Sequence, residues 1–264
     1  MLTHINKTSN NIWLIFLLII FLGIAAPHIY AKDTCVDCHK DAKFLIQNKK
    51  LFDYYKTWQD SAHDVAGVKC FDCHGGDPTK TDKDEAHKSH FSSFLSDDSE
   101  SIKFIPLQCG KCHEEVLMNF MTSKHYKVIK NKKGEGPNCI TCHGSMNVGI
   151  YEASEIGKSC EVCHNDKTKN SPEMGKVAER VLNNVNILRI YKEWLSSHNV
   201  YFDEIKQKKI IADYQDIVFS WHTFNFSQIE ARVREPLNES RDLIKGVLAD
   251  TKRKKYQQNK VRSN

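Results

Sequence analysis

The sequence predicts a mainly α-helical protein with long loops, and three features of its 264 residues support this. The segment from Cys35 to His164 repeats a short cysteine motif and lacks the alternating apolar pattern of strands. From Glu173 onward, apolar residues recur at helical spacing. An uncharged apolar run precedes both regions. We therefore divide the chain into a leader (1–31), a domain containing the repeated motifs (32–172), a C-terminal helical region (173–250) and a basic tail (251–264).

The leader resembles an export signal. Lys7 precedes the 15 apolar or small residues from Ile12 to Ala26, and Ala31 offers a small residue for cleavage. A retained membrane anchor is the alternative, although 15 residues fall short of the roughly 20 that span a bilayer. Both interpretations place the remainder of the chain outside the cytoplasm, in the periplasm or an equivalent compartment.

All 10 cysteines belong to C-x-x-C-H motifs. The five motifs are Cys35-x-x-Cys38-His39, Cys70-x-x-Cys73-His74, Cys109-x-x-Cys112-His113, Cys139-x-x-Cys142-His143 and Cys160-x-x-Cys163-His164. This motif is typical of covalent haem c attachment, in which two thiols form thioethers and the adjacent histidine binds the iron. A zinc array would not require a histidine directly after each second cysteine. The sequence therefore predicts five covalently attached haems.

These haems are expected to form much of the core of residues 32–172, with short helices and loops around them. They also change the charge. The formal net charge is +5, and two propionates on each haem would bring the holoprotein near neutral or below. The basic composition therefore does not indicate nucleic-acid binding. The tail keeps a local excess of six cations: Lys252, Arg253, Lys254, Lys255, Lys260 and Arg262. They form either a solvated end of the chain or a docking patch for an acidic partner or a membrane surface.

A two-haem unit is duplicated. Each unit consists of a motif, a helical stretch, an S-x-H sequence and a second motif followed by glycine. Ser61-x-His63 and Gly75 belong to the first unit, and Ser123-x-His125 and Gly144 belong to the second. The fifth motif follows the second unit. Conservation of S-x-H between the two copies predicts that His63 and His125 bind iron as sixth ligands.

The supply of histidines nearly matches the demand for sixth ligands. Six histidines after residue 31 lie outside the motifs: His63, His87, His90, His125, His198 and His222. His87 and His90 share one loop, and of the two we expect His87 to bind. His222 and His198 complete the predicted set of sixth ligands. Met146 follows the fourth motif and either packs against a porphyrin or reaches a neighbouring iron.

Two helical stripes are expected in the C-terminal region. The first includes Val181, Val185 and Leu188 and extends to His198; the second includes Ile211 and Val218 and carries His222 amid aromatic residues. They predict an antiparallel helical pair covering the haems, with a kink or interruption at Pro236.

The chain from Cys35 to Val233 resembles the multihaem cytochromes c related to the nitrifiers' tetrahaem electron-transfer cytochrome, hydroxylamine oxidoreductase and pentahaem nitrite reductase. The resemblance rests on S-x-H, the C-H-G motifs, Gly75-Gly76-Asp77-Pro78 and the Trp221-His222 pair. It implies haems packed in close pairs that conduct electrons. The nitrite reductases have a C-x-x-C-K motif, which this chain lacks, and the hydroxylamine oxidoreductases have eight haems, against five motifs here. Met146 also stands where many relatives have histidine.

Two functions follow as expectations. The first is an electron carrier between a quinol-side donor and a periplasmic or extracellular acceptor, with redox proteins as partners and no catalytic residue. The second is a multihaem reductase of a small nitrogen or sulfur oxyanion, which would need an iron with an open position. A membrane-anchored quinol dehydrogenase is a third possibility and would require an uncleaved leader.

Overall fold

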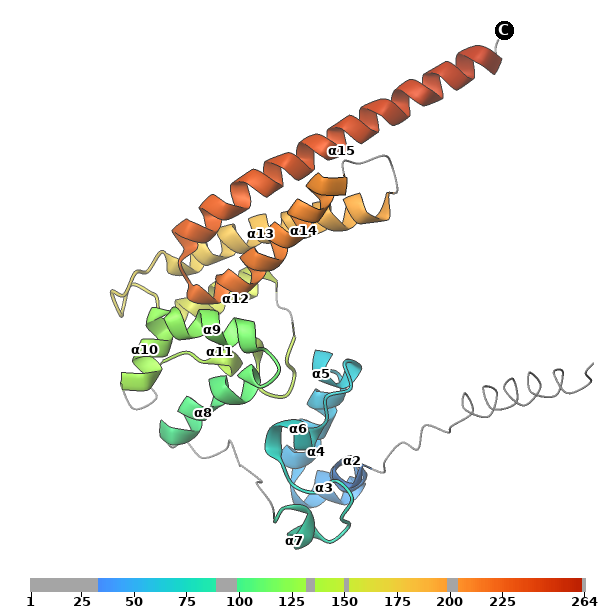
Figure 1. Ribbon diagram of the computed structural model, residues 1–264. Coiled ribbons are helices and arrows are strands. Elements are labelled where there is room, and N and C mark those ends of the chain that lie inside the picture. Colours follow the sequence, from blue (N-terminus) through green and yellow to red (C-terminus); the bar gives the residue numbers. More distant parts are fainter. Residues whose placement is uncertain (1–32, 89–98, 132–135, 150–151, 199–203, 263–264) are drawn as a thin grey trace, which may run out of the picture.

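The computed structural model describes residues 33–88, 99–131, 136–149, 152–198 and 204–262. These residues are mostly helical, and no strand occurs among them, which confirms the mainly α-helical prediction (Figure 1). The predicted leader and His90 lie outside the described ranges.

Six short helices form the N-terminal group: α2 (Thr34–His39), α3 (Ala42–Gln47), α4 (Lys49–Gln59), α5 (Ala62–Val65), α6 (Cys70–His74) and α7 (Lys83–Ala86). Asp33 caps α2 by accepting hydrogen bonds from the backbone N–H groups of Cys35 and Val36. Thr34 donates from its backbone N–H and its hydroxyl to the Pro78 carbonyl, at 3.0 and 2.8 Å. These bonds join the first motif to the loop that follows the second.

The middle group contains α8 (Ser99–Gly110), α9 (Glu114–Thr122), α10 (Lys124–Asn131), α11 (Cys139–His143) and α12 (Ala153–Glu161). Helix α8 contacts α9, α10 and α11, and α12 packs along α13 (Met174–Ser197). The Gln108 amide of α8 also donates to the Asp72 carbonyl of α6, at 3.1 Å. The middle group therefore contacts the N-terminal group on one side and the C-terminal helices on the other.

Three helices form the C-terminal region instead of the predicted pair: α13, α14 (Glu204–Ser220) and α15 (Phe226–Arg262). A 3₁₀ turn, η1 (Trp221–Thr223), separates α14 from α15. Their facing sides form one apolar cluster in which Ala178, Val181 and Leu188 are fully buried. Burial of such a stripe on each helix stabilises their association.

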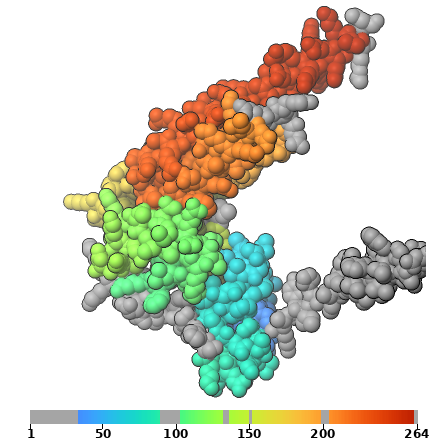
Figure 2. Space-filling model, in the orientation of Figure 1, coloured from blue at the N-terminus to red at the C-terminus, as the bar shows by residue number. Residues whose placement is uncertain are grey.

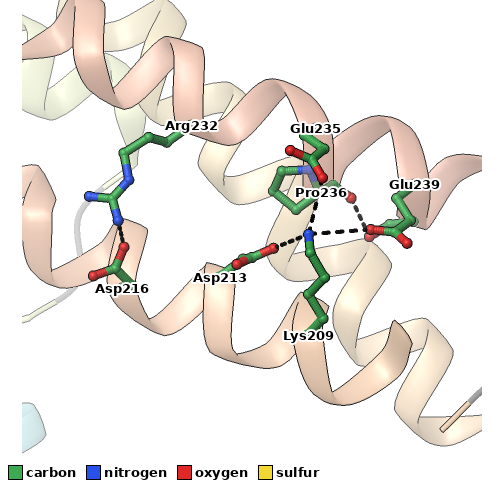
Figure 3. Close-up of polar contacts among 8 residues, drawn as sticks. Lys209, Asp213, Asp216, Arg232, Glu235, Pro236 and Glu239 are labelled. Carbon is green, nitrogen blue, oxygen red and sulfur yellow. Dashed lines mark hydrogen bonds and ion pairs between the residues drawn. The ribbon is translucent and has the colours of Figure 1, made fainter. Parts of the chain in front are cut away.

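The predicted interruption at Pro236 is wrong. Helix α15 continues through this buried proline, and the chain breaks earlier, at Trp221–Asn225, where Phe224 adopts a left-handed backbone conformation (φ 55°). Ion pairs hold α14 against α15 on both sides of Pro236 (Figure 3). Before Pro236, Arg232 contacts Asp216 and Glu235 contacts Lys209 at 3.2 Å; after it, Glu239 contacts the same lysine at 3.7 Å. Packing and these contacts offset the one backbone hydrogen bond that a proline removes.

The last part of α15 extends beyond the helices that cover its first part (Figure 2). Residues 251–261, predicted as part of the basic tail, continue the helix and are all exposed. Within the described part of the chain, no helix has the length and apolar character needed to cross a bilayer.

Candidate functional site

Each C-x-x-C-H motif occupies about one helical turn. Three motifs lie in α2, α6 and α11, and the others lie at the ends of α8 and α12. The turn persists in these last two, where the N–H groups of His113 and His164 donate to the carbonyls of Cys109 and Cys160, at 3.0 and 2.8 Å. Positions i, i+3 and i+4 share one face of a helix, so each motif presents both thiols and its imidazole on the same side. None of the ten cysteines is in a disulfide.

The two motifs that close the duplicated units begin and end in the same way. The backbone N–H before each first cysteine donates to a side chain inside the motif: Lys69 to Asp72 at 2.7 Å, and Asn138 to Thr141 at 3.0 Å. Each helix then stops at a glycine with positive φ, 70° at Gly75 and 74° at Gly144. Any other residue would be strained in this conformation, which accounts for the Gly after each motif.

The serine of each S-x-H sequence is a buried helix cap, a role that our sequence analysis did not assign. The Ser61 hydroxyl accepts from the Asp64 N–H at 3.3 Å, and the Ser123 hydroxyl accepts from the Tyr126 N–H at 3.0 Å. Both serines are nearly inaccessible to solvent. The cap places the histidine in the first turn of the following helix. A serine immediately before a helix is the signal that could have predicted this.

A buried aromatic residue precedes each serine by three positions. Trp58 and Phe120 are 8% and 6% exposed, and their carbonyls accept from the N–H groups of Ser61 and Ser123, both at 2.9 Å. The duplicated unit is therefore aromatic-x-x-Ser-x-His, with the same hydrogen bond in both copies. This recurrence supports a duplication of structure as well as of sequence.

Thiols of consecutive motifs are close enough to influence each other's protonation. Burial raises the pKa of Cys70 to about 12, with a further increase from nearby Cys35. Burial also raises the pKa of Cys73, and Cys109 adds to this effect. A hydrogen bond with Cys139 lowers the pKa of Cys109.

Thiols of the last two motifs also influence each other's protonation. Burial raises the pKa of Cys160 to about 11, and nearby Cys142 adds to this effect. The five motifs are thus neighbours in the order in which they occur along the chain, from the first to the fifth.

Four motif histidines each face a histidine from outside the motifs. The ring centroids are 6.3 Å apart for His39 and His87, 6.3 Å for His63 and His113, 6.0 Å for His125 and His164, and 6.2 Å for His143 and His222. The partners come from different elements: α7, α5, α10 and η1 supply the four that lie outside the motifs.

This separation fits two imidazoles that bind one metal from opposite sides. A metal–imidazole bond is about 2 Å and the ring centre lies about 1.2 Å behind the nitrogen, which gives about 6.4 Å between centroids. Stacked aromatic rings in contact would lie nearer, as Trp194 and His198 do at 4.0 Å. The four pairs could therefore each hold a six-coordinate haem iron.

The surroundings of these histidine rings also favour their neutral form. Burial lowers the pKa of His39, His63 and His125, and in each case the paired histidine lowers it further. The pKa of His222 falls to about 4 for the same two reasons. Neutral imidazole is the form that binds a metal.

Three of the eight ring orientations are fixed by hydrogen bonds through Nδ1, which leaves Nε2 directed away from the backbone. His87, His143 and His164 pair through Nδ1 with the carbonyls of Lys83, Gly149 and Asn170, at 2.7, 3.3 and 2.7 Å. Such bonds orient metal-binding histidines in proteins.

The remaining predicted ligands are placed differently. His74, the histidine of the second motif, lies close enough to His39 to lower the pKa of His39. His198 ends α13, where its ring stacks on Trp194 and its Nδ1 lies 3.0 Å from the Trp194 carbonyl. Among the described residues, no ring contact joins His198 to a motif histidine. Met146 is half-buried in the loop after α11.

The pairing itself was not predicted from sequence. His63 precedes the second motif yet faces the third, and His125 precedes the fourth yet faces the fifth. Each S-x-H histidine therefore reaches the first motif that follows its own two-motif unit. The N–H of Ala62 donates to the Val148 carbonyl at 3.1 Å and ties this part of the N-terminal group to the loop after α11.

Space and apolar surface occur beside the motifs. A cavity of about 470 Å³ is lined by Cys112, His113, Met118 and Phe219 among others, and one of about 480 Å³ lies beside Val36, at the first motif. Several large apolar side chains near the motifs are exposed: Leu45, Ile46, Val65, Phe104, Leu107, Met118, Met121 and Val162. A large flat apolar group could cover such surfaces.

In comparisons with known proteins, no family model, curated protein or solved structure matches the chain. In the part of the chain that the structure describes, no group of three or more His, Cys, Asp or Glu side chains is arranged to hold a metal ion. The candidate sites are thus pairs of histidines, each next to two thiols.

Proposed function

We propose that this protein is a pentahaem c-type cytochrome that transfers electrons. The observation that carries the proposal is the placement of four motif histidines at 6.0–6.3 Å from a second histidine. The two thiols of each motif would hold a porphyrin by thioether bonds, and the paired imidazoles would occupy both axial positions of its iron. A haem supplies an iron that accepts and releases one electron.

Within this proposal, the axial pairs are His39 with His87, His113 with His63, His143 with His222, and His164 with His125. His74 would be the proximal ligand of the second haem. His90 and His198 are the candidates for its sixth ligand. The neighbouring thiols of consecutive motifs would place the haems in chain order, so that electrons pass from one end of the series to the other.

Two imidazoles on each of four irons would favour a carrier over a reductase. An oxyanion such as nitrite has to bind the iron, and two imidazoles leave it no position on that iron. Export by the leader would place the carrier in the periplasm or an equivalent compartment. There it would connect a quinol-side donor with an extracytoplasmic acceptor. The exposed cations at the end of α15 would attract an acidic redox partner or lipid headgroups.

Intact mass and electron paramagnetic resonance (EPR) test the proposal together. The mature protein should exceed its polypeptide mass by five haems, and its oxidised spectrum should be dominated by low-spin iron. Carbon monoxide should leave at least four of the five haems unchanged in the reduced protein. Fewer than five haems in fully matured protein would overturn the stoichiometry. One haem that binds carbon monoxide, with steady turnover of nitrite or hydroxylamine, would identify a reductase instead.

Variants of the S-x-H histidines test the ligand pairs. His63→Ala and His125→Ala should each convert one haem in five to high spin, because each removes a sixth ligand and leaves the motif intact. His198→Ala tests the histidine that stacks on Trp194, and an unchanged spectrum would leave the sixth position of the second haem to His90. If His198→Ala also converted one haem, His198 would be the sixth ligand of the second haem. All-low-spin spectra in both S-x-H variants would remove these two pairs.

A further inference from the structure

The Nδ1 hydrogen bond that orients three of the facing histidines is missing at two others, His125 and His222. The Nδ1 atom of His125 is buried and has no hydrogen-bond partner, whereas its paired residue, His164, is 2.7 Å from the Asn170 carbonyl. An axial histidine without such a bond can rotate about its bond to the metal. Another contact has to fix the plane of the His125 ring.

Phe224 makes that contact. Its ring lies 4.6 Å from the His125 ring, centroid to centroid, at an interplanar angle of 68°. This is an edge-to-face arrangement, which is favourable between aromatic rings at 4.5–7 Å. The Phe224 ring also lies edge-to-face with Phe120 at 6.2 Å and with Phe226 at 6.3 Å. Phe224 is therefore held by two further rings while it packs against His125.

The backbone at Phe224 is unusual for a bulky residue. Its φ and ψ of 55° and 24° lie in the left-handed region, and its N–H donates to the Trp221 carbonyl at 2.9 Å. Large side chains rarely adopt this conformation, and such outliers persist where surrounding contacts maintain them. The conformation ends η1 and lets the chain reverse into α15 just after His222. It thereby directs the Phe224 ring toward α10 and His125.

We propose that Phe224 is a positioning residue that fixes the ring plane of His125, and through it the electronic properties of the fifth haem. The inference rests on the proposed function, because it assigns His125 as a ligand of that haem. Phe224 lies two residues after His222, which faces the fourth motif. One turn between α14 and α15 would thus supply a ligand to one haem and orient a ligand of the next.

The test uses the mature holoprotein with Phe224→Leu. We expect five haems and low-spin iron, because neither histidine of the pair is removed. One of the five low-spin EPR signals should shift in its g values, since these depend on the relative orientation of the two imidazole planes. The reduction potential of the same haem should shift with it. In a His125→Ala background, Phe224→Leu should produce no further change.

Two variants separate ring contact from general damage. Phe224→Asn removes the ring but suits the left-handed backbone, so the protein should remain stable while the same signal shifts. Val233→Ala is the control for general loss of packing, because Val233 is buried in the same apolar cluster but supplies no aromatic ring to the Phe224 contacts; the EPR signals should stay unchanged.

Wild-type g values in both Phe224 variants, with five haems bound, would overturn this inference and leave the proposed function intact. A mature chain without haem would overturn both. A shift of the same signal in Val233→Ala would show that loss of packing is sufficient, and would also contradict the role assigned to Phe224.

Discussion

The C-terminal helices and the segment with the motifs are stabilised in different ways. In α13–α15 a continuous cluster of apolar side chains is buried, with Leu188, Ile210 and Ile229 at 0–1% exposure. The five-motif segment, which is longer, has only scattered buried apolar residues, such as Trp58, Phe120 and Ile129.

This difference indicates where the polypeptide provides its own core. Side chains of α13–α15 remove enough apolar surface from water to hold the three helices together. Around the motifs, short helices with few mutual contacts would lose more chain entropy than their side chains offset. We therefore expect the haems to complete the core of residues 34–164.

The largest expected effect comes from preventing haem attachment. Protein made without haem maturation should lose hydrogen-exchange protection over residues 34–164, because the proposed core would be missing. Residues 174–244 should keep slow exchange, since their cluster consists of side chains. Equal protection of both regions in haem-free protein would show that the motif segment folds by itself.

The reverse perturbation is a cavity in the helical cluster. Leu188→Ala should lower the free energy of unfolding of α13–α15 by about 2–5 kcal/mol, because Leu188 is fully buried. Chemical denaturation followed by far-UV circular dichroism measures this change. Ile190→Ala on the same helix is the control, since Ile190 is 53% exposed, and it should change stability far less. A similar loss in both variants would contradict the assignment of the core.

The serine caps should matter less. Ser61→Ala and Ser123→Ala each remove one capping hydrogen bond and should each cost about 1 kcal/mol. Under the proposed function, each should also loosen the histidine two residues later, and a minor high-spin signal would report this. Thr substitutions keep the hydroxyl and serve as controls. If the Ala variants matched wild type in both measurements, the serine repeated in the two units would have no role in placing its histidine.

The smallest effect is expected at the surface. Lys209 contacts Asp213, Glu235 and Glu239, and Lys209→Met should change stability by less than about 1 kcal/mol because the side chain is 47% exposed (Figure 3). The difference should disappear in high salt, which screens exposed ion pairs. A salt-independent loss of several kcal/mol would indicate that these ion pairs, and not only the apolar cluster, hold α14 against α15.

Local sequence patterns predicted parts of this architecture. Apolar spacing indicated helices around Val181 and Ile217, and the repeated S-x-H predicted that both units share a structure, which Ser61 and Ser123 support. The number of C-terminal helices was predicted incorrectly because the second stripe runs past Ser220. No residue type there signals a break: the turn depends on Phe224 in a conformation that its sequence does not favour. The effect of Pro236 on the helix was overestimated, because packing on α13 and α14 maintains the helix around it.

The sequence by itself determined which residues are available for the proposed chemistry: ten cysteines and five histidines in fixed motifs, and six further histidines after residue 31. Covalent spacing within one helical turn is a local property, so the motif alone specifies it. Only the tertiary structure decided which histidines face each other. His63 meets His113 and His125 meets His164 because the helices that carry them pack across the boundaries of the repeated unit. Such contacts between residues distant in the chain depend on the whole fold, and no local pattern encodes them.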